Sequence, residues 1–376
     1  MRSLMVLIDG LGDEPIAKLN GKTPFEYATH LNIDKIAAQG MLSAISICED
    51  DIIPESSSCI LRLLGVSKKD MPQSRSYLEL LANGRDISEY EMVLRCNLVA
   101  VDTSGKMVGF NGYGLSPEMM EKAANLCNDI FAKVEFIHLS EYRNLIIMDK
   151  EASVLSCEIP PPHEHVGENV QELLSEVLQK SLVLKCFLDK AETKLKEFAH
   201  DGIHYMLYPW GSAGRHIMPS FNQLHHKSGA AVCKAEIVHG IAKALKMQVC
   251  VPEKATGDVD TDIEAKLTAA LKLLQDNDFV IAHFNGSDEA SHRYDYAEKI
   301  RFIEHIDSCF LGKLAASCNE PLKIIICGDH ITSSVTGKHG RGQVPVVAGY
   351  LDYQTSEKIK LTTYHDIIKF LMGESD

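Results

Sequence analysis

The chain has 376 residues, of which 45% are hydrophobic and 24% charged, and its formal net charge at pH 7 is −14. This composition is typical of a globular protein with room for one large core and a second domain. The acidic balance excludes a nucleic acid or an anionic membrane as partner, because both require a basic docking face. The 11 cysteines include no C-x-x-C pair, so we expect reduced thiols and a cytoplasmic location.

The first apolar run, at residues 4–8, predicts a buried strand. Asp9 stands directly at its carboxyl end and is followed by Gly10. Asp-Gly is a favoured turn pair, so an ordinary turn is one interpretation. Ligands of open α/β sheets bind outside the carboxyl ends of the strands, which makes Asp9 a candidate ligand. A helix at residues 32–39 and a second strand at 41–47 follow.

Three consecutive serines, Ser56, Ser57 and Ser58, precede an apolar helical segment at residues 60–65. A helix cap with a solvated loop accounts for them, and the residues alone favour this interpretation. The alternative is a nucleophile at a helix N-terminus, where the free N–H groups and the helix dipole favour a phosphate. A serine hydroxyl needs a base or a metal ion to become a good nucleophile.

Residues 85–155 have an α+β pattern that interrupts the α/β pattern of the chain. We therefore expect a core domain formed by 1–80 and 200–376, an inserted α+β domain at 85–160 and a connecting helical segment at 161–199. The insert is predicted to contain strands at 93–101, 106–110, 133–137 and 144–148 and a helix at 117–131, and the connecting segment a helix at 169–200.

After the insert, the α/β pattern resumes with a strand at residues 205–208 and a glycine-bearing loop at 210–215. Three acidic residues, Asp258, Asp260 and Asp262, follow within five positions. They offer ligands for a cation, but a solvated loop that ends in a helix cap is the favoured interpretation. The other elements predicted in this half are helices at 230–245, 262–275 and 363–372 and strands at 248–251, 279–284, 322–327 and 344–348.

Two of these buried strands are followed by carboxylates and imidazoles. Asp288 and His292 come after the strand at 279–284, and four residues apart they share one face of a helix. Asp329 and His330 come after the strand at 322–327, and His339 lies nine residues further on. Each residue alone suits a helix cap or an ordinary histidine. Together they predict a site for zinc, manganese or a similar ion, with most of the ligands for two metals.

Several motifs in order resemble the cofactor-independent phosphoglycerate mutases of the archaeal type, within the alkaline phosphatase superfamily. The resemblance covers nearly the whole chain and implies a mostly parallel sheet flanked by helices, with an inserted smaller α+β domain. The most specific matches are Asp288-Glu289-Ala290-Ser291-His292, Gly328-Asp329-His330 with His339, Arg95-Cys96-Asn97-Leu98 and Ala255-Thr256-Gly257-Asp258.

The resemblance implies metal-dependent transfer through a phosphoserine, which interconverts 2- and 3-phosphoglycerate without 2,3-bisphosphoglycerate. Counting back from Leu63-Leu64-Gly65 places the nucleophile at Ser56. We expect two divalent ions, manganese with zinc or magnesium as alternatives, and a small phosphorylated metabolite as substrate. The implied ligands are Asp9, Ser56, Asp329 and His330 for one ion and Asp288, His292 and His339 for the other.

The chain departs from the family mainly where phosphate and substrate are bound. Ser57 replaces an acidic residue and Ile60 a polar one. A bacterial branch, proposed to act on homoserine phosphate in threonine synthesis, resembles this chain at Trp210-Gly211 and Pro161-Pro162-His163. That activity is the main alternative, followed by a phosphatase or esterase and by a metal-binding protein without turnover. The candidate substrate contacts are Arg75, Arg95, His163 and Arg215, each of which also suits a surface salt bridge.

Overall fold

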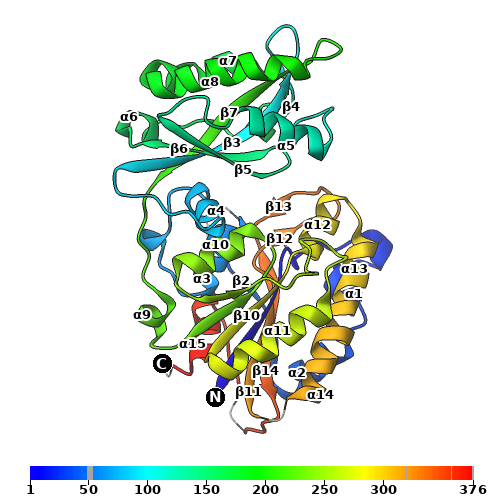
Figure 1. Cartoon of the computed structure of the whole chain (residues 1–376). Coiled ribbons are helices and arrows are strands. Elements are labelled where there is room, and N and C mark those ends of the chain that lie inside the picture. Colours follow the sequence, from blue (N-terminus) through cyan, green and yellow to red (C-terminus); the bar gives the residue numbers. More distant parts are fainter. Residues whose placement is uncertain (49–53, 319, 357, 375–376) are drawn as a thin grey trace. The chain divides into compact units, whose positions relative to one another are not determined.

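The computed structural model describes residues 1–48, 54–318, 320–356 and 358–374. The chain divides into two compact units, one formed by Met1–Met71 and Ile217–Asp376 and the other by Pro72–His216 (Figure 1). Within the described ranges, no helix combines the length and the apolar character that a membrane span requires.

The first unit contains a seven-stranded sheet in the order β2-β14-β11-β1-β10-β8-β9. The four pairs from β11 to β9 are parallel, and β14 is antiparallel to both β11 and β2. This confirms the prediction of a mostly parallel sheet. Its strands are β1 (Arg2–Ile8), β2 (Met41–Ser46), β8 (Gly229–Val232), β9 (Gln248–Cys250), β10 (Phe279–Phe284), β11 (Leu322–Cys327) and β14 (Gln343–Leu351).

Helices cover both faces of this sheet (Figure 1). Leu4, Val6 and Ile8 of β1 pack with apolar residues of α2, α11 and α13, which cover one face. Helices α10 and α15 pack together with α3 on the opposite face. The helical segments of this unit are η1 (Ala17–Leu19), α1 (Pro24–Tyr27), α2 (Leu31–Gln39), α3 (Ser56–Leu63), η2 (Lys68–Asp70), α9 (Phe221–His225), α10 (Glu236–Ala244), α11 (Ile263–Asp276), α12 (Gly286–His292), α13 (Tyr296–His305), η5 (Ile306–Leu311), α14 (Gly312–Ser317) and α15 (Tyr364–Met372).

The second unit contains an antiparallel sheet of β4, β3, β6 and β5, with β7 also paired to β3. Its hydrophobic core joins this sheet to α5, α7 and α8. The strands are β3 (Glu91–Val101), β4 (Met107–Gly109), β5 (Val134–Ser140), β6 (Arg143–Asp149) and β7 (His204–Gly214), and the helical segments are α4 (Ser76–Ala82), α5 (Pro117–Leu126), α6 (Ala152–Leu155), η3 (Pro162–Glu164), α7 (Val170–Lys180), α8 (Leu182–Leu195) and η4 (Lys196–Phe198).

The predicted helix at residues 230–245 is wrong in its first part. Ala230, Ala231 and Val232 belong to β8, which pairs with β10 on one side and β9 on the other. A strand that is buried on both faces has apolar side chains throughout. It therefore lacks the alternation of apolar and polar residues that marks a half-exposed strand. The helix α10 starts at Glu236 instead.

Three other predicted boundaries also differ from the structure. The helix at 169–200 is two helices, because Ser181 accepts a hydrogen bond from the N–H of Leu184 and caps a new helix there. The helix at 117–131 ends at Leu126. The predicted glycine loop at 210–215 is mostly strand, since β7 continues to Gly214 with a shift of register opposite β3.

The segment at 161–199, predicted as a connection, is part of the second unit. Leu174 of α7 and Leu184 and Phe187 of α8 are buried in the same core as β3 and β7. The helices are therefore one layer of the inserted unit, which spans 72–216 rather than the predicted 85–160. Amphipathic helices pack on a neighbouring sheet because this contact buries their apolar faces away from water.

Candidate metal centre

Three neighbouring strands of the first unit end at the same edge of its sheet. Parallel β1 lies between β11 and β10, so the residues that follow these strands come close together. Asp9 follows β1, Asp329 and His330 follow β11, and Asp288 lies in α12, just after β10. His339 comes from β13 (His339–Gly340), which pairs with β12 (Ile331–Thr332) beyond β11.

Ser56, the first residue of α3, lies beside the residues that follow β1 and β11. Its Oγ is 3.3 Å from Oδ1 of Asp9 and 3.1 Å from Nε2 of His330. The same Nε2 is 3.4 Å from Oδ1 of Asp9 and 3.4 Å from Oδ2 of Asp329. The four residues predicted to hold one metal therefore lie within a few ångströms of each other, and all but Ser56 are buried.

The three residues predicted to hold the other metal are also together. Nε2 of His292 is 3.2 Å from Oδ2 of Asp288, and Nε2 of His339 is 3.5 Å from Oδ1 of the same carboxylate. The two histidine Nε2 atoms are 3.2 Å apart. His330 joins the two groups, since its ring centroid is 4.2 Å from that of His339.

Two buried carboxylates, those of Asp9 and Asp329, lie close together in the deeper part of the cluster. Burial, together with the nearby charges of Asp329 and Asp288, raises the pKa of Asp9 well above its usual range. Oδ2 of Asp329 is buried and has no hydrogen-bond partner among the described residues. Buried charges in proteins are normally paired or bound to metal. Carboxylates and imidazoles are suitable donors for manganese, zinc or magnesium, so these residues fit divalent cations.

Asp288 and the two more exposed histidines stabilise each other in charged forms. Burial alone raises the pKa of Asp288, but hydrogen bonds from His292 and His339 hold it well below the usual range. The hydrogen bond to Asp288 raises the pKa of His292 to about 9. Burial has the opposite effect on His330 and lowers its pKa. The deeper part of the cluster therefore holds a neutral imidazole against carboxylates.

Gly10 allows the strand ends to approach closely. Its φ is +61°, in the left-handed region that favours glycine. A Cβ at this position would lie 2.6 Å from Oγ1 of Thr332 and 2.7 Å from Oδ1 of Asp288. The Asp9-Gly10 pair thus combines a candidate ligand with the space for neighbouring groups.

The sequence analysis missed two buried residues that contact the candidate ligands. His283 of β10 is completely buried, and its Nε2 is 2.9 Å from Oδ2 of Asp9. Thr332 of β12 is also buried, and its hydroxyl contacts Asp288 and His330. A histidine within an otherwise apolar strand was a signal for the first residue. Thr332 had no such signal.

The acidic loop at 255–262 follows the favoured interpretation. Asp262 accepts a hydrogen bond from the N–H of Ala265 and caps α11. Asp258 forms a two-pronged ion pair with Arg293, at 2.8 Å for each contact. The carboxylates of Asp258 and Asp262 are therefore bonded to other groups of the protein.

All four predicted substrate contacts belong to the second unit. Arg75 and Arg95 both pair with buried Glu79, at 2.9 and 3.0 Å. Arg95 also lies over the ring of Trp210, with its Cζ 4.0 Å from the ring centroid. The His163 and Trp210 ring centroids are 6.0 Å apart. Arg215 is paired with a different carboxylate, with its Nη2 3.6 Å from Oδ2 of Asp86.

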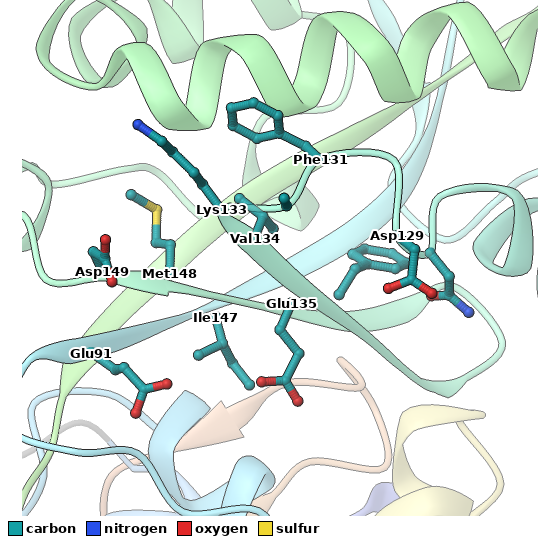
Figure 2. A pocket seen from close by; sticks show the side chains of 12 residues that line it. Glu91, Asp129, Phe131, Lys133, Val134, Glu135, Ile147, Met148 and Asp149 are labelled. Carbon is teal, nitrogen blue, oxygen red and sulfur yellow. The ribbon is translucent and has the colours of Figure 1, made fainter.

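The second unit also has a hollow of about 680 Å³, shown in Figure 2. Glu91, Asp129, Glu135 and Asp149 give it an acidic lining, with Lys133 as a basic residue. Glu91 and Glu135 are already paired with Arg85, at 2.8 and 3.1 Å. The hollow contains none of the predicted site residues.

Comparison with known proteins assigns the class. The sequence profile of the Metalloenzyme superfamily matches residues 1–368, so the chain belongs to this superfamily.

Particular relatives confirm the resemblance to phosphoglycerate mutases. The chain is 27% identical over 374 residues to the 2,3-bisphosphoglycerate-independent phosphoglycerate mutase of Methanosarcina barkeri, covering 95% of this chain and 92% of the relative. The PH0037 protein from Pyrococcus horikoshii has a similar structure, with a TM-score of 0.78 and 25% identity over 100% of this chain and 98% of that one. The cofactor-independent phosphoglycerate mutase from Thermoplasma acidophilum shares the fold, with a TM-score of 0.64 and 20% identity over 100% and 99% of the two chains.

Proposed function

We propose that this protein is a metal-dependent phosphoryl-transfer enzyme that interconverts 2- and 3-phosphoglycerate without 2,3-bisphosphoglycerate. The observation that carries the proposal is the position of Ser56, whose Oγ lies 3.1 Å from His330 and 3.3 Å from Asp9 at the edge of an acidic, buried cluster. Relatives that match nearly the full chain are named as phosphoglycerate mutases of this kind.

Ser56 is favoured over its neighbours as the nucleophile. The hydroxyl of Ser57 donates to Oε2 of Glu55, and the hydroxyl of Ser58 donates to the carbonyl of Glu55. Both therefore bond to the residue before the helix, whereas Ser56 contacts the cluster. Ser56 is also at the N-terminus of an eight-residue helix, where backbone N–H groups favour a phosphoryl group.

Asp9, Ser56, Asp329 and His330 would hold one divalent ion, and Asp288, His292 and His339 the other. Manganese is the proposed ion. Ions bound there would lower the pKa of the serine hydroxyl and neutralise charge on the phosphoryl oxygens.

The reaction proceeds in two transfers at the same serine. Oγ of Ser56 forms a bond to phosphorus as the bond from phosphorus to the glycerate oxygen breaks, and the serine proton passes to the departing oxygen. The phosphoserine then returns the group to the neighbouring hydroxyl of the same glycerate. No other phosphate donor is required, because the group that leaves in the first transfer is restored in the second.

An assay of 3-phosphoglycerate conversion, coupled to enolase, tests this proposal. Chelator-treated protein is assayed without 2,3-bisphosphoglycerate, before and after manganese is added. We expect activity that depends on manganese. Full activity after chelation, or no activity with two manganese ions bound per chain, would contradict the proposed reaction.

A second candidate is a phosphotransferase that acts on homoserine phosphate. It is supported by the second unit, where His163 and Trp210 lie together, since their sequence neighbourhoods resemble a branch proposed for that substrate. Glu79 also partly neutralises Arg75 and Arg95, which reduces the positive charge available to phosphoglycerate. If phosphoglycerate is inactive, turnover of homoserine phosphate by the manganese-loaded protein would favour this candidate.

A further inference from the structure

Thr332 lies between the two proposed ligand groups. Its Oγ1 is 2.5 Å from Oδ1 of Asp288 and 3.1 Å from Nδ1 of His330. Asp288 belongs to one group and His330 to the other. A single buried hydroxyl therefore contacts a ligand of each group.

The directions of these two hydrogen bonds follow from the number of protons. An ionised carboxylate only accepts, so the hydroxyl of Thr332 donates its one proton to Asp288. The contact with His330 must then run the other way, from Nδ1–H to a lone pair of Oγ1. A neutral imidazole with its proton on Nδ1 has its lone pair on Nε2. Nε2 is the atom that faces Ser56, Asp9 and Asp329.

The main chain of Thr332 is held by its neighbours, and the side-chain hydroxyl is oriented by its contacts with the two ligand groups. The N–H of Thr332 donates to the carbonyl of Gly12 at 3.0 Å. Its carbonyl accepts from Nζ of buried Lys299, also at 3.0 Å. Lys299 is in turn paired with Asp13 at 2.9 Å and bonded to the carbonyl of Gly12 at 3.1 Å. The loop after β1 and Lys299 of α13 therefore hold the threonine main chain from both sides.

We propose that Thr332 is a positioning residue that couples the two metal-ligand groups, because its hydroxyl orients Asp288 and fixes the His330 tautomer that presents Nε2 to the cluster. This inference rests on the metal-dependent function proposed above. An ion bound at one group holds the hydroxyl in place for the other, so the two ions bind cooperatively. Outer-shell partners of metal ligands typically contribute 10–100-fold in affinity, and here one partner serves both groups.

The test measures manganese binding rather than activity. Chelator-treated protein is titrated with manganese, and unbound Mn²⁺ is measured by electron paramagnetic resonance. We compare wild type with Thr332→Val, which removes the hydroxyl, and Thr332→Ser, which retains it. Thr336→Val is the matched control, because this threonine lies in the same segment with an exposed side chain.

Wild type, Thr332→Ser and Thr336→Val are expected to bind two ions cooperatively. Thr332→Val is expected to bind them about 10–100-fold more weakly and without cooperativity. Wild-type affinity and cooperativity in Thr332→Val would overturn this inference and leave the proposed function standing. Failure of the wild type to bind manganese would overturn both.

A spectroscopic measurement tests the tautomer directly. ¹⁵N NMR of metal-free protein labelled at histidine, with the His330 signals identified by their loss in His330→Asn, is expected to show the proton on Nδ1. The same tautomer is expected in Thr332→Ser, and its loss in Thr332→Val. A proton on Nε2 in the wild type would overturn the inference, even if Thr332→Val does not fold.

Discussion

Two buried ionic clusters in this molecule differ in how their charge is balanced. In the second unit, the carboxylate of Glu79 is only 2% exposed and is paired with both Arg75 and Arg95. In the first unit, the ion-pair partners of Asp9, Asp329 and Asp288 among the described residues are histidines, and Oδ2 of Asp329 lacks a hydrogen-bond partner there. The charge of Glu79 is balanced by arginines of the protein, whereas the cluster of Asp9, Asp329 and Asp288 has donors that fit divalent cations.

The pKa values of Asp9 and Glu79 shift in opposite directions, although burial raises both. Burial raises the pKa of Asp9, and the neighbouring carboxylates raise it further. Burial acts on Glu79 in the same way, but the charges of Arg95 and Arg75 outweigh it and lower its pKa below the ordinary value of 4.5. Where arginines of the protein pair with the buried carboxylate, as at Glu79, its role is structural. Where other carboxylates surround it, as at Asp9, it is a candidate binding site for a cation.

The largest expected effect is the loss of phosphoryl transfer in Ser56→Ala. We expect transfer to fall by about 10³-fold or more, because the neighbouring Ser57 and Ser58 bond to Glu55 instead of the cluster. Both metals should remain largely bound, since the other ligands are intact. The coupled assay and elemental analysis check these outcomes. Loss of activity in Ser57→Ala, with full activity in Ser56→Ala, would show that the nucleophile is Ser57 and not Ser56.

Removal of the metals should produce the next largest effect. Ions that bind only the folded state stabilise it by about 4 kcal/mol each when their concentration is a thousand times Kd. We therefore expect a chelator to lower Tm and manganese to restore it. Asp288→Ala should lose metal and much of this response. If Tm were the same with chelator and with manganese, the claim that this cluster binds divalent cations would be contradicted.

Glu79→Gln should destabilise the protein by about 3–5 kcal/mol, because it leaves two buried or partly buried guanidinium groups without their carboxylate. The loss should not depend on manganese, since Glu79 is balanced by the protein alone. Urea unfolding of wild type and variant, with and without manganese, measures this. If manganese restored the stability of Glu79→Gln, the charge of Glu79 would not be balanced by the protein alone.

Because the pKa of Glu79 is lowered in the folded protein, the destabilisation caused by Glu79→Gln should depend on pH. A carboxylate with a lower pKa in the folded state contributes its full stabilisation above the ordinary value of 4.5 and loses it as pH falls through the folded-state pKa. The difference in unfolding free energy between wild type and Glu79→Gln should therefore shrink as pH decreases below about 4.5. A constant difference between pH 6 and pH 3 would exclude this role.

The smallest effect is expected from Arg215→Ala. Arg215 is 39% exposed, and its contact with Asp86 is long, at 3.6 Å. Exposed ion pairs contribute about 0–1 kcal/mol, so urea unfolding should detect little change. If the variant retains stability but has a much higher KM for phosphoglycerate, Arg215 is a substrate contact as predicted from the sequence.

The sequence predicted which candidate ligands would come together because of their positions after the strands. Asp9, Asp329 and Asp288 follow apolar runs, and the ends of parallel strands meet at one edge of a sheet. Thr332 could not be predicted, since its role depends on a register between short strands, β12 and β13, that no periodicity reveals. The pairing of Glu79 with Arg95 was missed because Arg95 is 16 residues away, on β3, whereas Arg75 is an i,i+4 neighbour.

The errors in the predicted fold have a related cause. Ala230 and Ala231 were assigned to a helix because small apolar residues fit a helix as well as a doubly covered strand. The choice depends on the neighbours β10 and β9, which are far away in the sequence. The boundaries of the inserted unit were misjudged for the same reason, because the packing of α7 and α8 on the sheet is a tertiary property.

Anomalous diffraction from crystals grown with manganese tests the central claim most directly, because it locates the ions. The account predicts two peaks about 3.5–4 Å apart. One should be bound by Asp9, Ser56, Asp329 and His330, and the other by Asp288, His292 and His339. The absence of a peak in this cluster, or peaks only at the acidic hollow of Figure 2, would contradict it.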